Sequence, residues 1–325
     1  MVENRFAELR ARRALADAGF DVHGHLRSVE SVTNEVWETN DVVLRVNRRL
    51  HSRLRREAEI ASLLPPEVPY PKVIEVGGGS GQDWVVLDRI PGTPLVRAWP
   101  TMERADRRRA VEELAGTLRS LHTTTVPREL ADISDPPQLL VPGPLATEPA
   151  LQALDRVEGL EFVDRGVIAE LRSYVRGARS ALDPFESDHL IHGDLHFQNV
   201  LWDGQHITAL LDLEFARAAP PDLDLDVFLR FCSYPALFVP VGREHEAQQQ
   251  DYGEVPGWFR QAYPELFDHP ALIDRLRLYA IAFDLKHVLA EPPRGPLGSL
   301  TLEHPYRRLM ATVRRESYID RLARR

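Results

Sequence analysis

Cysteine is almost absent from this chain of 325 residues, which contains only Cys232. A single thiol excludes an internal disulfide and a cysteine-based metal cluster, and we expect Cys232 to be a small buried residue. Long apolar runs are missing too. No segment approaches the roughly 20 residues that span a bilayer, and the N-terminal stretch MVENRFAELRARR has no apolar core. The sequence therefore predicts neither a membrane segment nor a signal peptide, and it favours the reducing cytoplasm.

The chain has fewer positively than negatively charged residues. The 40 Lys and Arg residues are outnumbered by 49 Asp and Glu residues, which gives a net charge of -9. Because general nucleic-acid binders usually present a basic surface, we expect no nucleic-acid partner. The hydrophobic content of 43% and the charged content of 27% are ordinary for a globular protein. A chain of this length can bury a large core and form two lobes.

The first 90 residues read mainly as strands. Helical periodicity occurs over residues 4–18 and 50–64, and Pro65 and Pro66 end the second stretch. Strand-like patterns occupy RSVESV, EVWET, VVLRV, KVIEV and DWVVLDRI. Five strands with one inserted helix predict a small antiparallel-sheet lobe. The stretch PGTPL, at 91–95, has the proline and glycine punctuation of a connector.

Beyond the connector the pattern is mostly helical. We predict helices over residues 101–122, 164–182, 222–232 and 271–291, and an irregular surface loop over the proline-rich residues 126–150. No internal repeat is visible. The predicted architecture is α+β and bilobal, with a sheet-containing lobe over residues 1–90 and a helical lobe over residues 91–325.

One stretch, LIHGDLHFQNVLWDGQHITALLDLEFA, combines a polar loop with a hairpin signal. Asp203-Gly204 between two apolar runs predicts the hairpin turn. The hairpin would bring Asp194 and Asn199 together at one end and deliver Asp212 beside them. Carboxylate and amide oxygens suit Mg²⁺ held jointly with the phosphates of a nucleotide, and a remaining carboxylate can accept a hydroxyl proton. These residues indicate phosphoryl transfer.

HGDLHFQN followed by LLDLEFA resembles the catalytic signature of the aminoglycoside phosphotransferase and choline kinase-like superfamily, which is related to protein kinases. The resemblance implies a bilobal protein-kinase-like fold whose N-terminal lobe binds a nucleotide. It also implies that Asp194 is the catalytic base and that Asn199 and Asp212 bind Mg²⁺. His192 and Asp224 would support the catalytic loop, and Asp222 and Asp226 would face solvent or cap a helix.

The resemblance also assigns nucleotide-binding residues. Arg45, in the strand VVLRV, would hold the α- and β-phosphates, and Glu57 on the following helix would position it. The turn SVTN would cover the phosphates with Ser31 and Thr33, although it lacks the glycines that the superfamily commonly has there. The main chain of Asp88, Arg89 and Ile90 would form the hinge that reads the base of ATP or GTP.

The acceptor is the least defined part of the prediction. Residues 219–270 contain nine Asp or Glu and three Arg, which would attract a cationic amine as the wall of a pocket or would form a solvated acidic surface. Residues 301–325 contain seven Arg and three Asp or Glu, which would repel such an amine if they lay at the pocket. Glu214 would lie near the metal or the acceptor, or form an ordinary ion pair. Some aromatic side chains would be core residues or would wall a pocket for a larger, less polar acceptor: Tyr234, Phe238, Trp258, Phe259 and Tyr263.

The sequence therefore predicts a kinase that transfers the γ-phosphate of ATP or GTP to a hydroxyl of a small molecule, with Mg²⁺ as cofactor. An aminoglycoside or related antibiotic is the first choice of acceptor. A macrolide, a sugar or an amino alcohol is the alternative, and a non-catalytic nucleotide-binding regulatory module is a further one. A protein kinase is disfavoured because no Ala-Pro-Glu anchor follows Asp212. The sequence predicts no particular oligomeric state.

Overall fold

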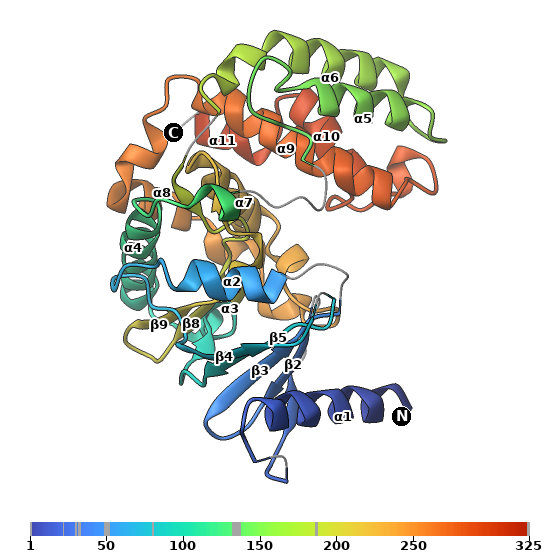
Figure 1. Ribbon diagram of the computed structural model, residues 1–325. Helices are drawn as coiled ribbons and strands as arrows, with labels where there is room; N and C mark the ends of the chain where they lie inside the picture. Colours follow the sequence, from blue (N-terminus) through green and yellow to red (C-terminus); the bar gives the residue numbers. More distant parts are fainter. Residues whose placement is uncertain are drawn as a thin grey trace.

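The computed structural model describes residues 2–21, 23–29, 31, 34–48, 53–79, 81–131, 138–185 and 188–323 (Figure 1). Its small lobe is an antiparallel sheet with a helix on each face, and its large lobe is mainly helical. The predicted bilobal α+β fold is therefore confirmed. Of the predicted site residues, Thr33 lies outside the described ranges.

The small lobe contains all five predicted strands in the order β1-β2-β3-β5-β4. Its elements are α1 (Val2–Asp17), β1 (Arg27–Val29), β2 (Glu35–Glu38), β3 (Val42–Val46), α2 (Arg53–Ala61), β4 (Val73–Gly77) and β5 (Trp84–Asp88). Helix α2 ends at Ala61, before the predicted end at residue 64, and the predicted residues 50–52 lie outside the described ranges.

Alternation along β5 explains why helices cover both faces of this sheet. Trp84 and Val86 belong to the same cluster as Leu15 of α1, whereas Val85 and Leu87 cluster with Leu54 of α2. Successive side chains of a strand point to opposite faces, so each helix buries one half of the strand. Figure 1 shows α1 and α2 on the two sides of the sheet, with α2 toward the large lobe.

The large lobe begins with a short strand and helix that lead away from the sheet. Its helices are α3 (Leu95–Ala98), α4 (Arg104–Leu121), α5 (Glu148–Glu158), α6 (Arg165–Gly177), α7 (Asp222–Ser233), α8 (Val255–Ala262), α9 (Leu272–Ala290), α10 (Pro305–Val313) and α11 (Tyr318–Ala323). The predictions for α4, α6, α7 and α9 are confirmed to within a few residues at each end. Helices α5, α8, α10 and α11 were not predicted.

The predicted hairpin is present. Strands β8 (Val200–Trp202) and β9 (Ile207–Leu210) pair antiparallel around the turn, and β6 (Thr93–Pro94), in the predicted connector, adds a third strand beside β8. A separate pair, β7 (Leu190–Ile191) and β10 (Arg217–Ala218), flanks the hairpin at its two ends. The catalytic motif is thus held at both ends by strand pairing.

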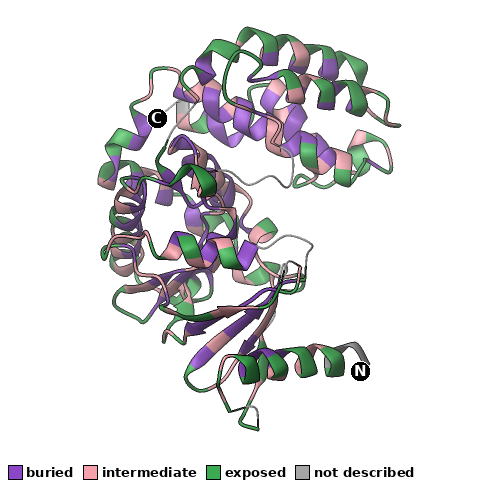
Figure 2. Ribbon diagram, in the orientation of Figure 1, coloured by how far each residue is buried: buried purple, intermediate pink, exposed green. Residues whose placement is uncertain are grey.

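The main core fills the large lobe and extends beneath the hairpin. Figure 2 shows buried residues concentrated where α9 meets its neighbouring helices and along the strands of the small lobe. Cys232 is a buried free cysteine, as predicted. None of the described helices is both long enough and apolar enough to cross a membrane.

Candidate active site

The loop between β7 and β8 carries the predicted catalytic residues, and glycine is required at its second position. Gly193 has a φ of +80°, and a Cβ atom there would lie 2.4 Å from the carbonyl oxygen of Phe215. A side chain at this position would be strained and would also collide with the backbone. Glycine therefore allows the loop to lie directly against the segment that follows Asp212.

Asp224, near the start of α7, binds the backbone of this loop. Its carboxylate accepts hydrogen bonds from the amides of His192 at 2.8 Å and Gly193 at 2.7 Å, and its Oδ2 lies 3.1 Å from Nε2 of His122. Burial alone would raise the pKa of Asp224, but His122, His192 and the backbone donor keep it below its usual value. A buried, ionised carboxylate thus fixes the loop in place, and His122 is a partner that the sequence analysis missed.

Asp194 projects from the loop into a large cavity. Its Oδ2 lies 3.3 Å from Nε2 of His196, and its main-chain oxygen accepts a hydrogen bond from the side chain of Asn199 at 3.0 Å. Burial would raise its pKa, but the imidazoles of His196 and His192 hold the pKa below the usual range for an aspartate. Asp194 is therefore ionised at neutral pH and can accept a hydrogen bond from a hydroxyl group.

The acidic residues of the segment 219–270 are mostly absent from the wall of this cavity. Of the nine Asp and Glu residues in the segment, only Asp226 lines the cavity, and it is ion-paired with Arg230. Asp222 is buried against Arg275. The prediction that Asp222 and Asp226 face solvent or cap a helix is wrong, because both are buried in ion pairs. No described residue from 301–323 lines the cavity.

The imidazole ring of His192 contacts two backbone groups, one in the loop and one at the end of β9. Its Nδ1 accepts a hydrogen bond from the amide of Asp194 at 3.2 Å, and its Nε2 lies 2.9 Å from the carbonyl oxygen of Leu211. The ring is fully buried, so both of its nitrogens are used within the protein. His192 consequently connects the catalytic loop to the end of β9, immediately before Asp212.

Asp212 joins the two lobes through an ion-paired network. Its Oδ1 lies 2.8 Å from Nη2 of Arg45, and Nη1 of Arg45 lies 2.6 Å from Oε1 of Glu57. Oε1 of Glu57 also accepts hydrogen bonds from the hydroxyl of Tyr70 at 2.8 Å and from the amide of Leu213 at 3.0 Å. The structure thus brings together Arg45, Glu57 and Asp212, three of the residues that were predicted to take part in phosphate and metal binding, and it adds Tyr70.

Burial and the neighbouring charges shift the pKa values of Glu57 and Arg45 in this network. Burial raises the pKa of Glu57 despite the opposing effect of Arg45. Burial would lower the pKa of Arg45, but Glu57 and Asp212 keep it well above its ordinary value. Arg45 therefore remains a cation, buried between the carboxylates of Glu57 and Asp212.

Asp212 has a left-handed backbone conformation, with φ of 64° and ψ of 69°. Such a conformation is uncommon for a residue other than glycine and is maintained only when the surroundings impose it. Here the pairing with Arg45 and the bond from the next amide to Glu57 impose it. The carboxylate is thereby turned toward the small lobe rather than along the strand.

Asn199 and Asp212 have the donor atoms that a magnesium ion requires. The Asn199 amide nitrogen binds the carbonyl of Asp194, and no described residue donates to its oxygen; Arg45 binds one carboxylate oxygen of Asp212 and leaves the other. The described residues contain no group of three or more His, Cys, Asp or Glu suited to a metal. Two hard oxygens match Mg²⁺ that completes its shell with water and phosphate.

Glu214, just after Asp212, contacts the predicted phosphate turn at Asn34, a contact that the sequence analysis did not predict. The amide of Asn34 donates to Oε2 of Glu214 at 3.1 Å, and Oε1 of Glu214 lies 4.0 Å from Arg53. Glu214 is only 1% exposed, so it is a buried link between the lobes. Ser31 is exposed and lines a cavity on the outer side of the sheet. Its phosphate contact remains a prediction.

The hinge residues differ in the availability of their main-chain groups. The amide of Asp88 donates to the carbonyl of Lys72, and the amide of Arg89 donates to the carbonyl of Asp41, both at 2.9 Å. Among the described residues, the main chain of Ile90 has no hydrogen-bond partner. If the hinge reads a base, both main-chain groups of Ile90 are therefore available for it.

The contact of Glu57 with Arg45 should affect nucleotide binding. The Glu57→Gln variant should raise the KM for nucleotide about tenfold, because Arg45 loses its charged partner and the Leu213 amide loses a charged acceptor. The matched control is Glu59→Gln, which changes an exposed glutamate on the same helix. Steady-state kinetics with varied nucleotide measure both, and an equal effect of the two variants would contradict the positioning role.

A sheet lobe with a buried Arg–Glu pair, placed over a loop with Asp and Asn and a hairpin ending in Asp, defines a protein-kinase-like fold. The chain belongs to the phosphotransferase enzyme family, whose family model matches residues 25–264. The predicted resemblance is thus confirmed at the level of the family. The match includes every predicted site residue from Ser31 to Asp224.

Known proteins agree with this assignment. The aminoglycoside 3′-phosphotransferase of Streptomyces ribosidificus is 30% identical over 168 residues, which cover 50% of this chain but only 59% of that relative. The GDP complex of aminoglycoside 2′-phosphotransferase-IIIa has a TM-score of 0.61 at 18% identity, covering 90% of this chain and 92% of that one. A choline/ethanolamine kinase family protein from Mesorhizobium loti has a TM-score of 0.60 at 18% identity, covering 100% and 99%. The two structures share the fold.

Proposed function

We propose that this protein transfers the γ-phosphate of ATP or GTP to a hydroxyl of a small molecule, with Mg²⁺ as cofactor. The observation that carries the proposal is the position of Asp194, which lines a cavity of about 940 Å³. Asp194 belongs to the same motif as Asp212, whose carboxylate is ion-paired with Arg45 of the small lobe. Solved structures with a similar fold hold ADP with hygromycin B, or GDP. A reaction that consumes nucleotide also agrees with the predicted cytoplasmic location.

In the proposed mechanism the protein supplies position and charge. Asp194 accepts a hydrogen bond from the acceptor hydroxyl, aligns its oxygen with the phosphorus atom and takes its proton late in the transfer. Because the transition state of phosphoryl transfer is loose, the low pKa of Asp194 does not prevent this role. Arg45 meets phosphate oxygens, and Asn199 and Asp212 would hold Mg²⁺, which supplies charge neutralisation on the phosphates.

Two classes of acceptor are each supported by a different observation. The relative from Streptomyces ribosidificus, by its name, acts on aminoglycosides, which supports the acceptor favoured by the sequence analysis. The cavity next to Asp194 favours a less polar molecule, because most of its wall is aliphatic or aromatic. Its large apolar side chains are Leu139, Leu140, Phe185, Ile191, Phe215, Leu223, Phe238, Tyr279 and Phe283. We therefore propose the reaction class, and the screen described next identifies the acceptor molecule.

A nucleotide-consumption screen tests the proposed function. Purified protein is incubated with ATP or GTP, Mg²⁺ and a panel containing aminoglycosides, macrolides, sugars, amino alcohols and hydroxylated acids. At least one acceptor should become a phosphomonoester by phosphorus NMR, and chelation of Mg²⁺ should abolish the product. If nucleotide binds while every acceptor remains unmodified, the proposed kinase activity is wrong and a regulatory binding module becomes the better explanation.

A further inference from the structure

Tyr70 lies where the small lobe meets the large lobe. It belongs to residues 62–72, which connect α2 to β4. Its side chain packs against the main core, which fills the large lobe, and also against the small-lobe cluster that contains Leu54, Val85 and Leu87. The ring is thus held from both lobes, and its hydroxyl has a defined position relative to each of them.

The hydroxyl of Tyr70 donates to a carboxylate oxygen that also accepts from two other groups. Oε1 of Glu57 accepts the bond from Tyr70 at 2.8 Å. The same oxygen accepts from Nη1 of Arg45 at 2.6 Å and from the amide of Leu213 at 3.0 Å. Among the described residues, none donates to the buried Oε2 of Glu57. Because the hydrogen bonds converge on one oxygen, a rotation of this carboxylate would alter all three together.

The hydroxyl of Tyr70 keeps its proton at physiological pH. Burial and the neighbouring carboxylate of Glu57 raise the pKa of Tyr70 well above its ordinary value. Tyr70 therefore acts as the donor in this contact. A buried carboxylate oxygen whose donor is removed loses a hydrogen bond that water cannot readily replace, so the contact should matter for the orientation of Glu57.

Main-chain hydrogen bonds on either side of Asp212 form part of a closed circuit with this tyrosine. The amide of Leu210, two residues before Asp212, donates to the carbonyl of Pro69 at 2.7 Å. The amide of Leu213, directly after Asp212, donates to Glu57. The tyrosine closes the circuit, because it follows Pro69 directly in the chain and binds Glu57 through its hydroxyl. The left-handed backbone of Asp212 lies inside this circuit.

We infer that Tyr70 is a positioning residue for the phosphates of the nucleotide. It holds Oε1 of Glu57 at the point from which that oxygen binds both Arg45, the predicted phosphate ligand, and the segment that carries Asp212. The inference rests on the proposed nucleotide-dependent function and adds a residue to its site. Tyr70 acts through Glu57 rather than by contact with the nucleotide.

Nucleotide binding by the full chain tests this role without an acceptor. Calorimetry with Mg²⁺ and with ATP or GTP, whichever the wild type binds, is carried out on the wild type and on Tyr70→Phe. The substitution removes the hydroxyl and keeps the ring. We expect Tyr70→Phe to bind the nucleotide about fivefold more weakly, because Glu57 gains rotational freedom and Arg45 is held less firmly. Unchanged or tighter binding would overturn the inference.

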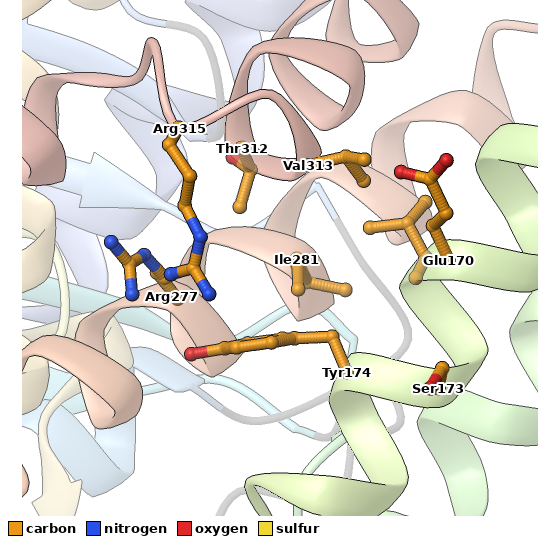
Figure 3. A pocket seen from close by; sticks show the side chains of 9 residues that line it. Glu170, Ser173, Tyr174, Arg277, Ile281, Thr312, Val313 and Arg315 are labelled. Atoms are coloured by element: carbon orange, nitrogen blue, oxygen red, sulfur yellow. The ribbon is translucent and has the colours of Figure 1, made fainter.

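Tyr174→Phe is the matched control. Tyr174 lines a separate cavity of about 280 Å³ between α6, α9 and α10 (Figure 3). Like Tyr70 it is partly buried, and its hydroxyl donates to a carboxylate, that of Asp274, at 2.6 Å. Tyr174→Phe therefore makes the same chemical change in the large lobe and should leave nucleotide affinity unchanged. Melting temperatures show that both variants are folded before their affinities are compared.

A double-mutant cycle tests whether Tyr70 acts through Glu57. The affinity change caused by Tyr70→Phe is measured in the wild type and in Glu57→Gln. We expect the fivefold loss to shrink to less than about twofold in Glu57→Gln, because the amide no longer offers Arg45 a charged partner. An Arg45→Gln background provides a second comparison with the same expectation. Equal losses in all backgrounds would mean that Tyr70 contributes through general packing, and the inference would be wrong.

The outcomes separate the inference from the proposed function. If the expected coupling is observed while no acceptor is phosphorylated in the screen, the inference is supported and the kinase function is contradicted. If an acceptor is phosphorylated while Tyr70→Phe binds nucleotide as tightly as the wild type does, the kinase function is supported and the inference is overturned. A wild-type protein that binds neither ATP nor GTP would contradict both.

Discussion

The Asp194→Asn variant is expected to lose roughly two to four orders of magnitude in kcat while its affinity for nucleotide is retained. The amide can still hydrogen-bond to the acceptor hydroxyl, but it cannot take the proton and no longer carries the charge that aligns the group. Asp194 forms no hydrogen bond or ion pair with Arg45, Glu57 or Asp212, so nucleotide binding should not depend on it. Kinetics with an acceptor identified in the screen, and calorimetry with nucleotide, measure the two quantities.

The pH profile and a control variant complete this test. Because the pKa of Asp194 is below its usual value, near 4, its ionisation should cause no fall in kcat between pH 8 and pH 5. The control Asp188→Asn changes an exposed aspartate just before β7 and should retain wild-type turnover. Turnover in Asp194→Asn close to the wild-type value would remove Asp194 from the catalytic step.

Local sequence patterns predicted the elements whose signals are periodic and uninterrupted. The β8–β9 hairpin could be predicted because Asp203-Gly204 lies between two apolar runs. Three of the missed helices share a different feature, a proline in the first turn: Pro149 in α5, Pro256 in α8 and Pro305 in α10. Proline there gives up no hydrogen bond, because the first amides of a helix have no intrahelical partner. The prediction of a proline-rich loop over residues 126–150 concealed the start of α5, and no helix was predicted over α8 or α10.

In the site, contacts between residues that are close in the sequence could be predicted, whereas contacts between residues that are far apart in the sequence could not. The catalytic loop and the metal segment lie within one short stretch, so their proximity follows from a single hairpin. The contact of Asn34 with Glu214 joins residues 180 positions apart, and that of His122 with Asp224 joins residues 102 positions apart. No spacing in one sequence marks such pairs. Net charge was equally uninformative about the cavity, because it does not show which carboxylates are consumed by internal ion pairs.

The Asp224→Asn variant is expected to lower the free energy of unfolding by about 2–4 kcal/mol. In the wild type, a fully buried carboxylate accepts hydrogen bonds from two consecutive amides, those of His192 and Gly193, and contacts His122. An asparagine side chain has one acceptor oxygen, and its NH₂ group would face one of those donors. Thermal melting and denaturant titration measure the loss, and kcat should fall with it because the catalytic loop is released.

The Asp203→Asn variant provides a closely matched control for Asp224. Asp203 also accepts hydrogen bonds from two backbone amides, those of Gln205 at 2.7 Å and His206 at 2.8 Å, but it is fully exposed at the hairpin turn. Asparagine is well suited to such a turn, and water can solvate any donor that is released, so its effect should be much smaller. Comparable destabilisation by the two variants would show that burial does not decide the cost.

The pH dependence of the Asp224 contribution follows from the direction of its pKa shift. Folding depresses the pKa of Asp224, so its contribution to stability is fully present above the unfolded value, about 3.9, and is lost as the pH falls through the lower folded value. The stability difference between wild type and Asp224→Asn should therefore be constant from pH 8 to pH 5 and should shrink below pH 4. A difference that grew on acidification would mean that Asp224 is protonated in the folded protein, and the catalytic loop would then be held by a neutral acid rather than by a charge.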